Sequence, residues 1–482
     1  MHRAAMCVAT ALLALGLARA NFARQEKHAV GSQSKQSPEA REIFKQLIEI
    51  NTTDSVGSVT AAAEAMAKRF RDAGFYDKDV ILAGPNERKK NLVVRFHGSG
   101  ARKPVLFIGH LDVVEARRED WTTDPFQFVE KDGYFYGRGA EDMKDGDAFL
   151  VANFIRLKRE GFVPDRDLIL ALTADEEGGD YNGVDWLVKE HRDWIDAEYC
   201  INLDGGEFIQ KGGKKLQVDI QTSEKVYADF QFESLNPGGH SSVPSPDNAI
   251  YHLSGALLRL RDFSFPTRMD DTTRNFFQAI SNQMSGQVAA DLKAITKEPP
   301  DEAALHRISQ DPYLNTLLRT TCVATMLTGG HAPNALPQMA RANVNCRIFP
   351  GDDPEEVRKT LERVAADPKV AVTVVPEKTA DGKSIPTVAV PASKVAPELN
   401  AAMRKTVDSL YGPLPVVLEM SAGATDGKFL RIAGIPTYGI GCVFFEMDDS
   451  RAHGKDERVG VKAFDEGVEF NYQLIRALSS GK

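Results

Sequence analysis

Four short runs rich in Val, Ile and Leu mark the first half of the chain: NLVVRF at 91–96, KPVLFIG at 103–109, LILALT at 168–173 and YCINL at 199–203. Runs of this kind are typical of strands that are buried on both faces of a sheet. Apolar residues recur at helical spacing in three segments around these runs, at 38–50, 60–74 and 146–161. This alternation predicts an α/β layer with a mainly parallel sheet.

The pattern changes at about residue 223. Segments then follow in the order strand, helix, two strands, helix and strand, at 226–235, 247–263, 319–327, 338–349, 353–367 and 370–376. That is the order of a split βαβ, ferredoxin-like α+β domain, here with a polar helical insertion at about 266–319. Because the first pattern returns afterwards, we expect a first domain in two parts, 38–222 and 381–482, with a second domain, 223–380, inserted into it.

The N-terminus predicts a secretory signal peptide. Arg3 precedes an apolar stretch at 4–18, and Ala18-Arg19-Ala20 is a small-x-small sequence, so we expect cleavage after Ala20 and a polar linker at 21–37. The alternative, a membrane anchor, needs about 20 apolar residues. We therefore expect an exported protein, located in the periplasm or the medium.

Composition narrows the range of partners. The chain has 482 residues, of which 42% are hydrophobic and 8% aromatic, as in globular proteins. Its formal net charge is −9, and removal of the predicted leader, which carries two arginines and no acidic residue, makes it more acidic. An acidic chain is poorly suited to bind nucleic acid or an anionic membrane surface.

Four cysteines follow the predicted leader, and none has the CxxC spacing of a metal or redox pair. Cys322 and Cys346 can form a disulfide if their strands are neighbours. Buried free thiols are the alternative.

Charged residues gather just beyond the carboxyl ends of three predicted strands. KPVLFIG runs into His110-Leu111-Asp112, LILALT runs into Asp175-Glu176-Glu177, and YCINL runs into Asp204. In open α/β sheets, ligands bind at this edge. The sequence therefore predicts that these clusters contribute to one site.

The residue types in these clusters suit metal-assisted hydrolysis. His110 and Asp112 point the same way in an extended chain, so the carboxylate can accept the imidazole N–H, as it does behind many zinc ligands. Glu176 and Glu177 diverge, so one can bind metal while the other acts as a base. Each cluster alone also has a structural interpretation: a hydrogen-bonded histidine, a helix cap at Asp142, or a solvated acidic loop.

A second histidine favours the metal site over these structural interpretations. His453 lies in the Gly-flanked loop RAHGKDERV. Two imidazoles and the carboxylates of Asp142, Glu177 and Asp204 fit two zinc ions that share a bridging carboxylate. A bridging hydroxide would balance the charges, and cobalt or manganese would tolerate the same ligands.

The blocks HLDVV, GRGAEDMKDG, TADEEGG, NLDGGE and AHGKDERV resemble, in this order, the signature blocks of the M20 metallopeptidase family. That family includes glutamate carboxypeptidases, aminoacylases and carnosinase-type dipeptidases. The resemblance runs from about residue 38 to the end of the chain. It implies a catalytic domain, 38–222 and 381–482, that is interrupted by a lid or dimerisation domain, 223–380, through which the chain forms a homodimer.

The resemblance also assigns roles position by position. One zinc is bound by His110 and Asp204, the other by Glu177 and His453, and both by Asp142 as the bridge. Asp112 orients His110, and Glu176 is the general base and acid. The family has a cis peptide bond after the bridging aspartate, here Asp142–Met143.

Further blocks match the lid and a later loop. NPGGHSSVP resembles the lid motif whose histidine, here His240, stabilises the oxyanion, often across a dimer interface. GGHAPNALP places Asn334 at a substrate-contacting position, and NCRIFPG places Arg347 where the family has an arginine suited to a substrate carboxylate. SAGATDGKF resembles a substrate-side loop, which makes Gly423 and Asp426 expected contacts, with a tight turn as the alternative.

We therefore expect an exported dizinc peptidase that hydrolyses the amide bond of small peptides or N-acyl amino acids through a metal-bridged hydroxide, with Glu176 as the base. Two alternatives remain at this point. One is a non-catalytic metal- and peptide-binding protein of the same fold. The other is an aminopeptidase of the M28 type, which is a single domain without the inserted lid.

Overall fold

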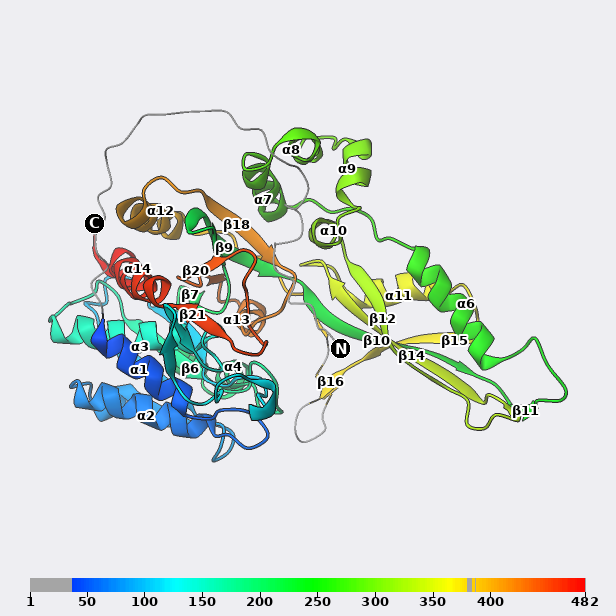
Figure 1. The fold of residues 1–482 in the computed structure, drawn as a ribbon, viewed down its shortest axis with the longest axis horizontal. Coiled ribbons are helices and arrows are strands. Elements are labelled where there is room, and N and C mark those ends of the chain that lie inside the picture. The colour runs from blue at the N-terminus through cyan, green and yellow to red at the C-terminus, as the bar shows by residue number, and fades with distance from the viewer. Residues whose placement is uncertain (1–36, 379–383, 386, 482) are drawn as a thin grey trace. The chain divides into compact units, whose positions relative to one another are not determined.

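The computed structural model describes residues 37–378, 384–385 and 387–481 (Figure 1). The predicted signal peptide and residues 21–36 of the predicted linker lie outside these ranges. The chain divides into two compact units: the first comprises the described part of Met1–Ile220 with Val395–Val417 and Ile435–Lys482, and the second comprises Gln221–Lys394 and Leu418–Gly434.

The boundary between the second unit and the C-terminal part of the first unit differs from the expected one. Residues 387–394 and 418–434 belong to the second unit, although the sequence predicted them in the second part of the catalytic domain. Backbone hydrogen bonds explain the difference, because the Ser393 N–H donates to the Thr222 carbonyl at 2.8 Å and the Lys225 N–H to the Ser421 carbonyl at 3.0 Å.

The first unit is built on one large sheet. Its strand order is β1 (Val80–Ala83), β2 (Asn91–Phe96), β6 (Leu168–Thr173), β3 (Val105–His110), β7 (Tyr199–Asn202), β19 (Thr437–Gly439), β9 (Lys214–Glu224), β8 (Phe208–Lys211) and β20 (Phe444–Glu446). β18 (Val416–Ser421) also pairs with β9. The central strands β6, β3, β7 and β19 are parallel, and β3, β6 and β7 are buried along their whole length, as the apolar runs predicted.

Amphipathic helices cover this sheet. They include α1 (Pro38–Glu49), α2 (Val59–Asp72), α3 (Lys144–Arg159), α12 (Pro397–Tyr411) and α14 (Val461–Ser479). Side-chain caps fix the N-termini of α1 and α2: the Ser37 hydroxyl accepts the Ala40 N–H, and the Ser58 hydroxyl accepts the Ala61 N–H. α3 is the predicted crossover helix between β3 and β6, and it packs against β3, α1 and α14.

Smaller elements complete the first unit. They are α4 (Gly183–Glu190), α5 (Arg192–Ile195) and a three-stranded sheet of β21 (Arg458–Gly460), β5 (Tyr134–Tyr136) and β4 (Val129–Lys131). Within the described residues, the helices include none that is long and apolar enough to cross a membrane.

The second unit is the predicted split βαβ domain. Its antiparallel sheet has the order β12 (Thr321–Gly329), β14 (Met339–Ile348), β10 (Val226–Leu235) and β15 (Val370–Val375), and α6 (Ala249–Asp262) and α11 (Pro354–Ala365) pack against it. The insertion forms α7 (Asp271–Ser281), α8 (Gly286–Ile295), α9 (Glu302–Ile308) and α10 (Pro312–Leu318). Short elements are β11 (Gly239–His240), β13 (Ala335–Leu336), β16 (Glu377–Lys378), β17 (Ser384–Ile385) and α13 (Gly427–Ile432).

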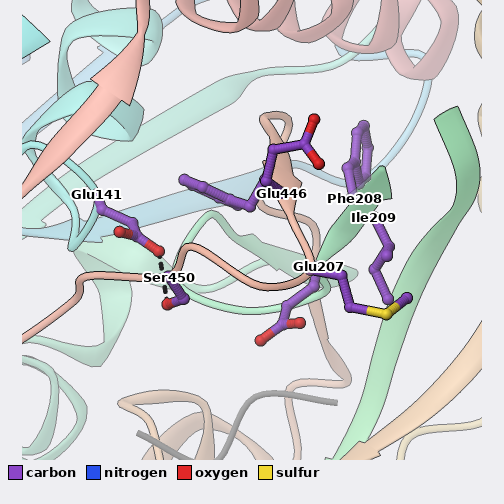
Figure 2. A pocket seen from close by; sticks show the side chains of 8 residues that line it. Glu141, Glu207, Phe208, Ile209, Glu446 and Ser450 are labelled. Carbon is purple, nitrogen blue, oxygen red and sulfur yellow. Dashed lines mark hydrogen bonds between the residues drawn. The ribbon is translucent and has the colours of Figure 1, made fainter. Parts of the chain in front are cut away.

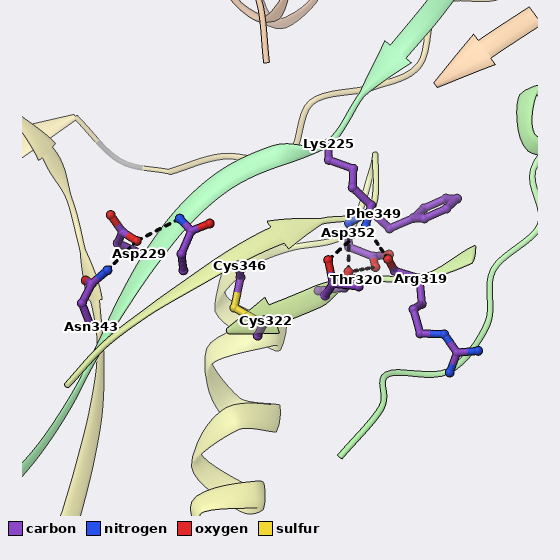
Figure 3. Close-up of a disulfide and its surroundings, with 11 residues drawn as sticks. Lys225, Asp229, Arg319, Thr320, Cys322, Asn343, Cys346, Phe349 and Asp352 are labelled. Atoms are coloured by element: carbon purple, nitrogen blue, oxygen red, sulfur yellow. Dashed lines mark hydrogen bonds between the residues drawn. A yellow bond between two sulfur atoms is a disulfide. The ribbon is translucent and has the colours of Figure 1, made fainter. Parts of the chain in front are cut away.

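A disulfide joins two neighbouring strands of the second unit. Cys322 in β12 lies directly opposite Cys346 in β14, and the two residues are bonded (Figure 3). The first of the two interpretations of these cysteines is therefore confirmed. Cys200 and Cys442 are buried free thiols.

Candidate metal centre

Five segments of the first unit carry the predicted metal ligands. β3 ends at His110, β6 is followed by the acidic stretch 175–177, and β7 is followed by Asp204. Asp142 lies in the loop before α3, and His453 lies between β20 and β21. Because β3, β6 and β7 are parallel neighbours, their carboxyl ends meet at one edge of the sheet.

Asp142 lies between the two histidines. Its Oδ1 is 3.1 Å from His110 Nε2, and its Oδ2 is 3.0 Å from His453 Nε2. Glu177 Oε1 is 2.7 Å from the same nitrogen of His453. The two oxygens of one carboxylate therefore face two different imidazoles, as a carboxylate shared between two metal ions requires.

The other carboxylates complete two groups of donor atoms. His110, Asp142 and Glu177 form one group, and His110, Glu176 and Asp204 form the other. Within each group the donor atoms lie within 4.8 Å of one another. The structure thus brings all five predicted ligands and the predicted base into one centre.

His110 presents its Nε2 atom to this centre. Its Nδ1 lies 3.0 Å from the carbonyl oxygen of Asp112, which can only accept, so Nδ1 donates and Nε2 faces Asp142. The sequence predicted that the Asp112 carboxylate would take this role, but its Oδ1 is 3.8 Å from Nδ1. That carboxylate instead accepts the backbone N–H groups of Glu176 at 3.1 Å and Glu177 at 2.9 Å. The carbonyl of Asp112 therefore orients the imidazole, and its carboxylate positions the two glutamates.

The third carboxylate of TADEEGG, that of Asp175, takes no part in the two donor groups. It forms an ion pair with the buried amine of Lys89, which also lies 2.7 Å from Asp54 Oδ1. The Asp175 backbone has a φ of 59°, which turns the chain as it leaves β6. Because Lys89 already balances its charge, Asp175 needs no metal ion.

The pKa values reveal an excess of negative charge at the centre. Burial would lower the pKa of His110, but its hydrogen bond to Asp142 and the nearby carboxylate charges raise it well above 6.5. Hydrogen bonds to Asp142 and Glu177 raise the pKa of His453 to about 10. Each raised pKa favours the protonated imidazole, whose positive charge balances part of the negative charge of the carboxylates.

The donor set fits divalent cations. Imidazole nitrogens and carboxylate oxygens are the ligands that zinc, cobalt and manganese accept, and carboxylates outnumber the histidines here. The Asp142–Met143 peptide bond is cis, as the family resemblance implied.

Two side chains that the sequence analysis did not single out connect the Asp142 loop to the loop between β20 and β21. Glu457 is fully buried, accepts the N–H groups of Glu141 at 2.7 Å and Asp142 at 3.1 Å, and pairs with Arg138 at 2.5 Å. Arg138 in turn donates to the Gly454 carbonyl at 3.0 Å. The block AHGKDERV contained Glu457, but it had been interpreted only through its histidine.

Glu141 makes a second connection between the same loops. Its carboxylate accepts the Ser450 hydroxyl at 2.7 Å (Figure 2). It also accepts the Arg451 N–H at 2.8 Å. Burial raises the pKa of Glu141 to about 7. The side chain lines a small cavity together with Glu207 and Glu446, next in sequence to the central Asp142.

The predicted oxyanion and substrate residues lie in the second unit. His240 in β11 is exposed and pairs with Ala335 in β13, and the Ser241 N–H donates to the Asn334 carbonyl at 3.1 Å. His240 and Asn334 are thus on adjoining segments. Arg347 lies over the ring of Tyr227, with 4.9 Å between its guanidinium carbon and the ring centroid.

The loop 421–426 also belongs to the second unit, although the sequence predicted it in the catalytic domain. The Gly423 N–H donates to Ser421 Oγ at 3.0 Å, which is a turn contact. Asp426 is buried and directly precedes α13. The loop therefore contains a local turn contact, and the substrate contacts of Gly423 and Asp426 stay predictions.

The names of proteins with similar sequences describe activities on N-acyl amino acids and peptides. Human N-fatty-acyl-amino acid synthase/hydrolase PM20D1 is 26% identical over 389 residues, which cover 78% of this chain and 74% of the human protein. Carboxypeptidase S from Saccharomyces cerevisiae is 29% identical over 265 residues, which cover 51% of this chain and 45% of the yeast protein.

Solved structures share the fold. The M20 family metallo-carboxypeptidase Sso-CP2 from Sulfolobus solfataricus matches with a TM-score of 0.65 at 16% identity, over 92% of this chain and 99% of that one. Human carnosine dipeptidase 1 matches with a TM-score of 0.58 at 14% identity, over 91% of this chain and 96% of that one. The separate second unit excludes the single-domain M28 alternative. Because the model of Peptidase family M20/M25/M40 matches residues 106–477, the chain belongs to this family of metal-dependent peptide-bond hydrolases.

Proposed function

We propose that the chain is an exported dizinc hydrolase that cleaves the amide bond of N-acyl amino acids or small peptides with a free carboxylate. The observation that carries the proposal is the placement of Asp142, whose two oxygens face His110 and His453, with Glu176 beside the same donor atoms. The names of the relatives support the substrate class.

One zinc ion would be held by His110 and Asp204, the other by Glu177 and His453, and Asp142 would be shared. When bound, the ions would polarise the scissile carbonyl and lower the pKa of a water molecule. The chain's own residues do the rest of the chemistry.

Glu176 is the proton carrier of the proposed reaction. Its backbone is held by the Asp112 carboxylate at 3.1 Å, and its side chain is in the donor group with His110 and Asp204. Glu176 takes the proton of the attacking water and delivers it to the leaving amine. In the second unit, His240 is proposed to donate to the oxyanion and Asn334 and Arg347 to bind substrate.

The test is to purify the mature chain, measure bound metal, and assay amine release from N-acyl amino acids and dipeptides with and without a chelator. We expect about two zinc ions per chain and release that stops when zinc is removed. Full metal content without release from any member of the panel would support the non-catalytic binding protein instead.

Zinc binding to the metal-free chain is expected to release at least one proton at pH 7. His453 holds a proton at this pH, because hydrogen bonds to Asp142 and Glu177 raise its pKa to about 10, and zinc binds only neutral imidazole. Zinc affinity therefore rises with pH, and the release from His453 fades as the pH passes its pKa of about 10. Titration calorimetry in two buffers of different ionisation enthalpy measures the release, and a value near zero at pH 7 would contradict this protonation state.

The second unit is proposed to form a homodimer. Its edge strand β12 exposes Val323, Met326 and Leu327, and α6, which contacts β12, exposes Tyr251 and Leu258. An exposed apolar edge strand is a template for pairing with a second copy.

Leu327→Glu is expected to convert the dimer to a monomer, because it places a charge in the apolar interface. Leu327 is 67% exposed in the single chain, and Val163 of the first unit, 72% exposed, offers the matched control Val163→Glu. Light scattering during size-exclusion chromatography measures the mass. A Leu327→Glu protein that remains dimeric would place the interface elsewhere.

A further inference from the structure

A buried ion pair lies behind the acidic stretch of the metal centre. Lys89, in the segment between β1 and β2, is 5% exposed, and Asp175, just after β6, is 3% exposed. The Lys89 amine pairs with Asp175 Oδ1 and lies 2.7 Å from Asp54 Oδ1. Buried ion pairs often contribute little net stability, because both charged groups lose their hydration. The pair is therefore better explained by the geometry that it fixes than by stability alone.

Asp175 closes the loop that follows β6 onto its own start. Its Oδ2 accepts the Tyr181 N–H at 3.2 Å, and its carbonyl oxygen accepts the Asn182 side-chain amide at 3.2 Å. Asn182 in turn caps α4, because its Oδ1 accepts the Asp185 N–H at 2.9 Å. One aspartate thus joins both ends of the loop 175–182 and connects it to the first turn of α4.

Gly179 lies against the same carboxylate. A β-carbon at Gly179 would be 2.4 Å from Asp175 Oδ2 and 2.5 Å from Asp175 Cγ, and the φ of Gly179 is 123°. Glycine accepts both the close approach and this φ, because it has no side chain. The position of the Asp175 carboxylate therefore determines the path of the loop.

The loop includes Glu176 and Glu177, whose backbone N–H groups donate to the Asp112 carboxylate at 3.1 and 2.9 Å. Those bonds hold the two glutamates from the β3 side. On the other side the chain enters them through Asp175, whose φ of 59° lies in the left-handed region that is uncommon for residues other than glycine. Lys89 holds the Asp175 carboxylate by a charge-assisted bond, the stronger kind of hydrogen bond. Without the amine this carboxylate would be a buried, unpaired charge and would turn toward water.

We propose that Lys89 is a positioning residue of the hydrolytic reaction, which acts through Asp175 to fix the backbone of Glu176 and so the direction of its carboxylate. The Lys89 amine is bonded to Asp175 and Asp54, and neither belongs to the two donor groups of the metal centre. The inference rests on the proposed function, in which Glu176 carries the proton. Catalysis is sensitive to placement, since a displacement of about 1 Å can cost about a hundredfold in rate.

Lys89→Met is expected to lower kcat by about 10- to 100-fold, while KM and zinc content stay as in the unmodified chain. All five proposed ligands remain, and only the loop that orients Glu176 is loosened. Lys89→Arg, which keeps the charge, is expected to recover part of the loss. Steady-state kinetics per zinc-loaded chain measure the effect, with the N-acyl amino acid or dipeptide that the unmodified chain hydrolyses fastest. Lys68→Met, at an exposed lysine of α2 paired with Asp72, is the matched control.

Hydrogen exchange tests the positioning without turnover. In the zinc-loaded Lys89→Met chain, peptides covering 174–182 are expected to exchange about tenfold faster, because the Tyr181 N–H loses the Asp175 carboxylate as its acceptor. Peptides covering β6, at 168–173, are expected to exchange as in the unmodified chain, since the strand stays paired on both sides. Mass spectrometry of the peptides measures both rates.

A second variant reaches the same carboxylate without changing Lys89. Gly179→Ala places a β-carbon where the Asp175 carboxylate lies, so it is expected to displace that group and to give the same fall in kcat and the same faster exchange. Gly161→Ala is its matched control, because Gly161 also has a positive φ, of 67°, but has open space around it. If Lys89→Met does not fold, Gly179→Ala provides both tests.

The outcomes separate this inference from the proposed function. Unchanged kcat per zinc-loaded chain in Lys89→Met would overturn the inference, whatever the melting temperature, and so would unchanged exchange at 174–182. A lower kcat together with faster exchange at 174–182 alone, shared by Gly179→Ala and absent in Gly161→Ala, would support it. An unmodified chain that releases no amine fails the proposed function instead, and the exchange rates then decide whether Lys89 positions the loop.

Discussion

Glu176→Gln is expected to bind zinc as the unmodified chain does and to hydrolyse substrate about 10³ times more slowly. Glutamine preserves the size of the side chain but cannot accept a proton at neutral pH, so the water loses its base and the amine loses its acid. The backbone at this position is held by Asp112 through the Glu176 N–H, which the substitution leaves in place. The fold of the segment should therefore be unchanged.

Metal analysis and steady-state kinetics on the same preparation test this expectation. Glu190→Gln, at the exposed end of α4, is the matched control and should be indistinguishable from the unmodified chain. A fall in kcat with full zinc content confirms the role of Glu176 in proton transfer. Near-normal turnover would exclude Glu176 as the base, and loss of zinc would make it a ligand.

Glu457→Ala is expected to destabilise the metal-free first unit by about 3–5 kcal/mol and to weaken zinc binding. The substitution leaves the Arg138 guanidinium, only 3% exposed, without its carboxylate, and it leaves the N–H groups of Glu141 and Asp142 without their acceptor. Because Asp142 is the proposed bridge, its loop and the His453 loop should separate. Denaturant unfolding and a zinc titration measure the two effects.

A double variant distinguishes stability from site geometry. Arg138→Met with Glu457→Met replaces the buried ion pair by apolar side chains and should recover much of the lost stability, as such replacements often do. Zinc affinity should stay low, because the backbone N–H groups remain without an acceptor. Recovery of both stability and zinc affinity would show that Glu457 acts only through Arg138. The control is Glu356→Ala, which removes one partner of a surface ion pair with Lys359 and should change the free energy of unfolding by less than about 1 kcal/mol.

Much of the candidate site follows from the strand pattern alone. The buried runs that became β3, β6 and β7 placed His110, the acidic stretch 175–177 and Asp204 at one sheet edge, because parallel strands share their carboxyl ends. No spacing rule links His453 or Asp142 to this edge; their residue types suggested them as ligands, and the family resemblance assigned their positions. The roles in substrate binding remain predictions.

Other features depend on details that a linear pattern does not contain. The spacing of His110 and Asp112 predicted correctly that Asp112 lies beside the imidazole. It could not decide whether the imidazole bonds to the carboxylate or to the backbone carbonyl of Asp112, since both lie within reach just after a strand. The Glu457–Arg138 pair joins residues more than 300 positions apart, and the block that contains Glu457 had been interpreted only through its histidine. The second unit extends to residue 394 and includes 418–434 because of backbone pairing that no composition shift marks.

The order in which the ribosome makes the chain has a consequence for the first unit. β19 fills the place between β7 and β9, and His453 follows it, so both arrive after the second unit has been synthesised. A polypeptide that ends before Thr437 leaves β7 without its parallel neighbour and Asp142 with a single histidine. The proposed metal centre therefore receives its second histidine late in synthesis, and a chain clipped before His453 lacks one of the five proposed ligands.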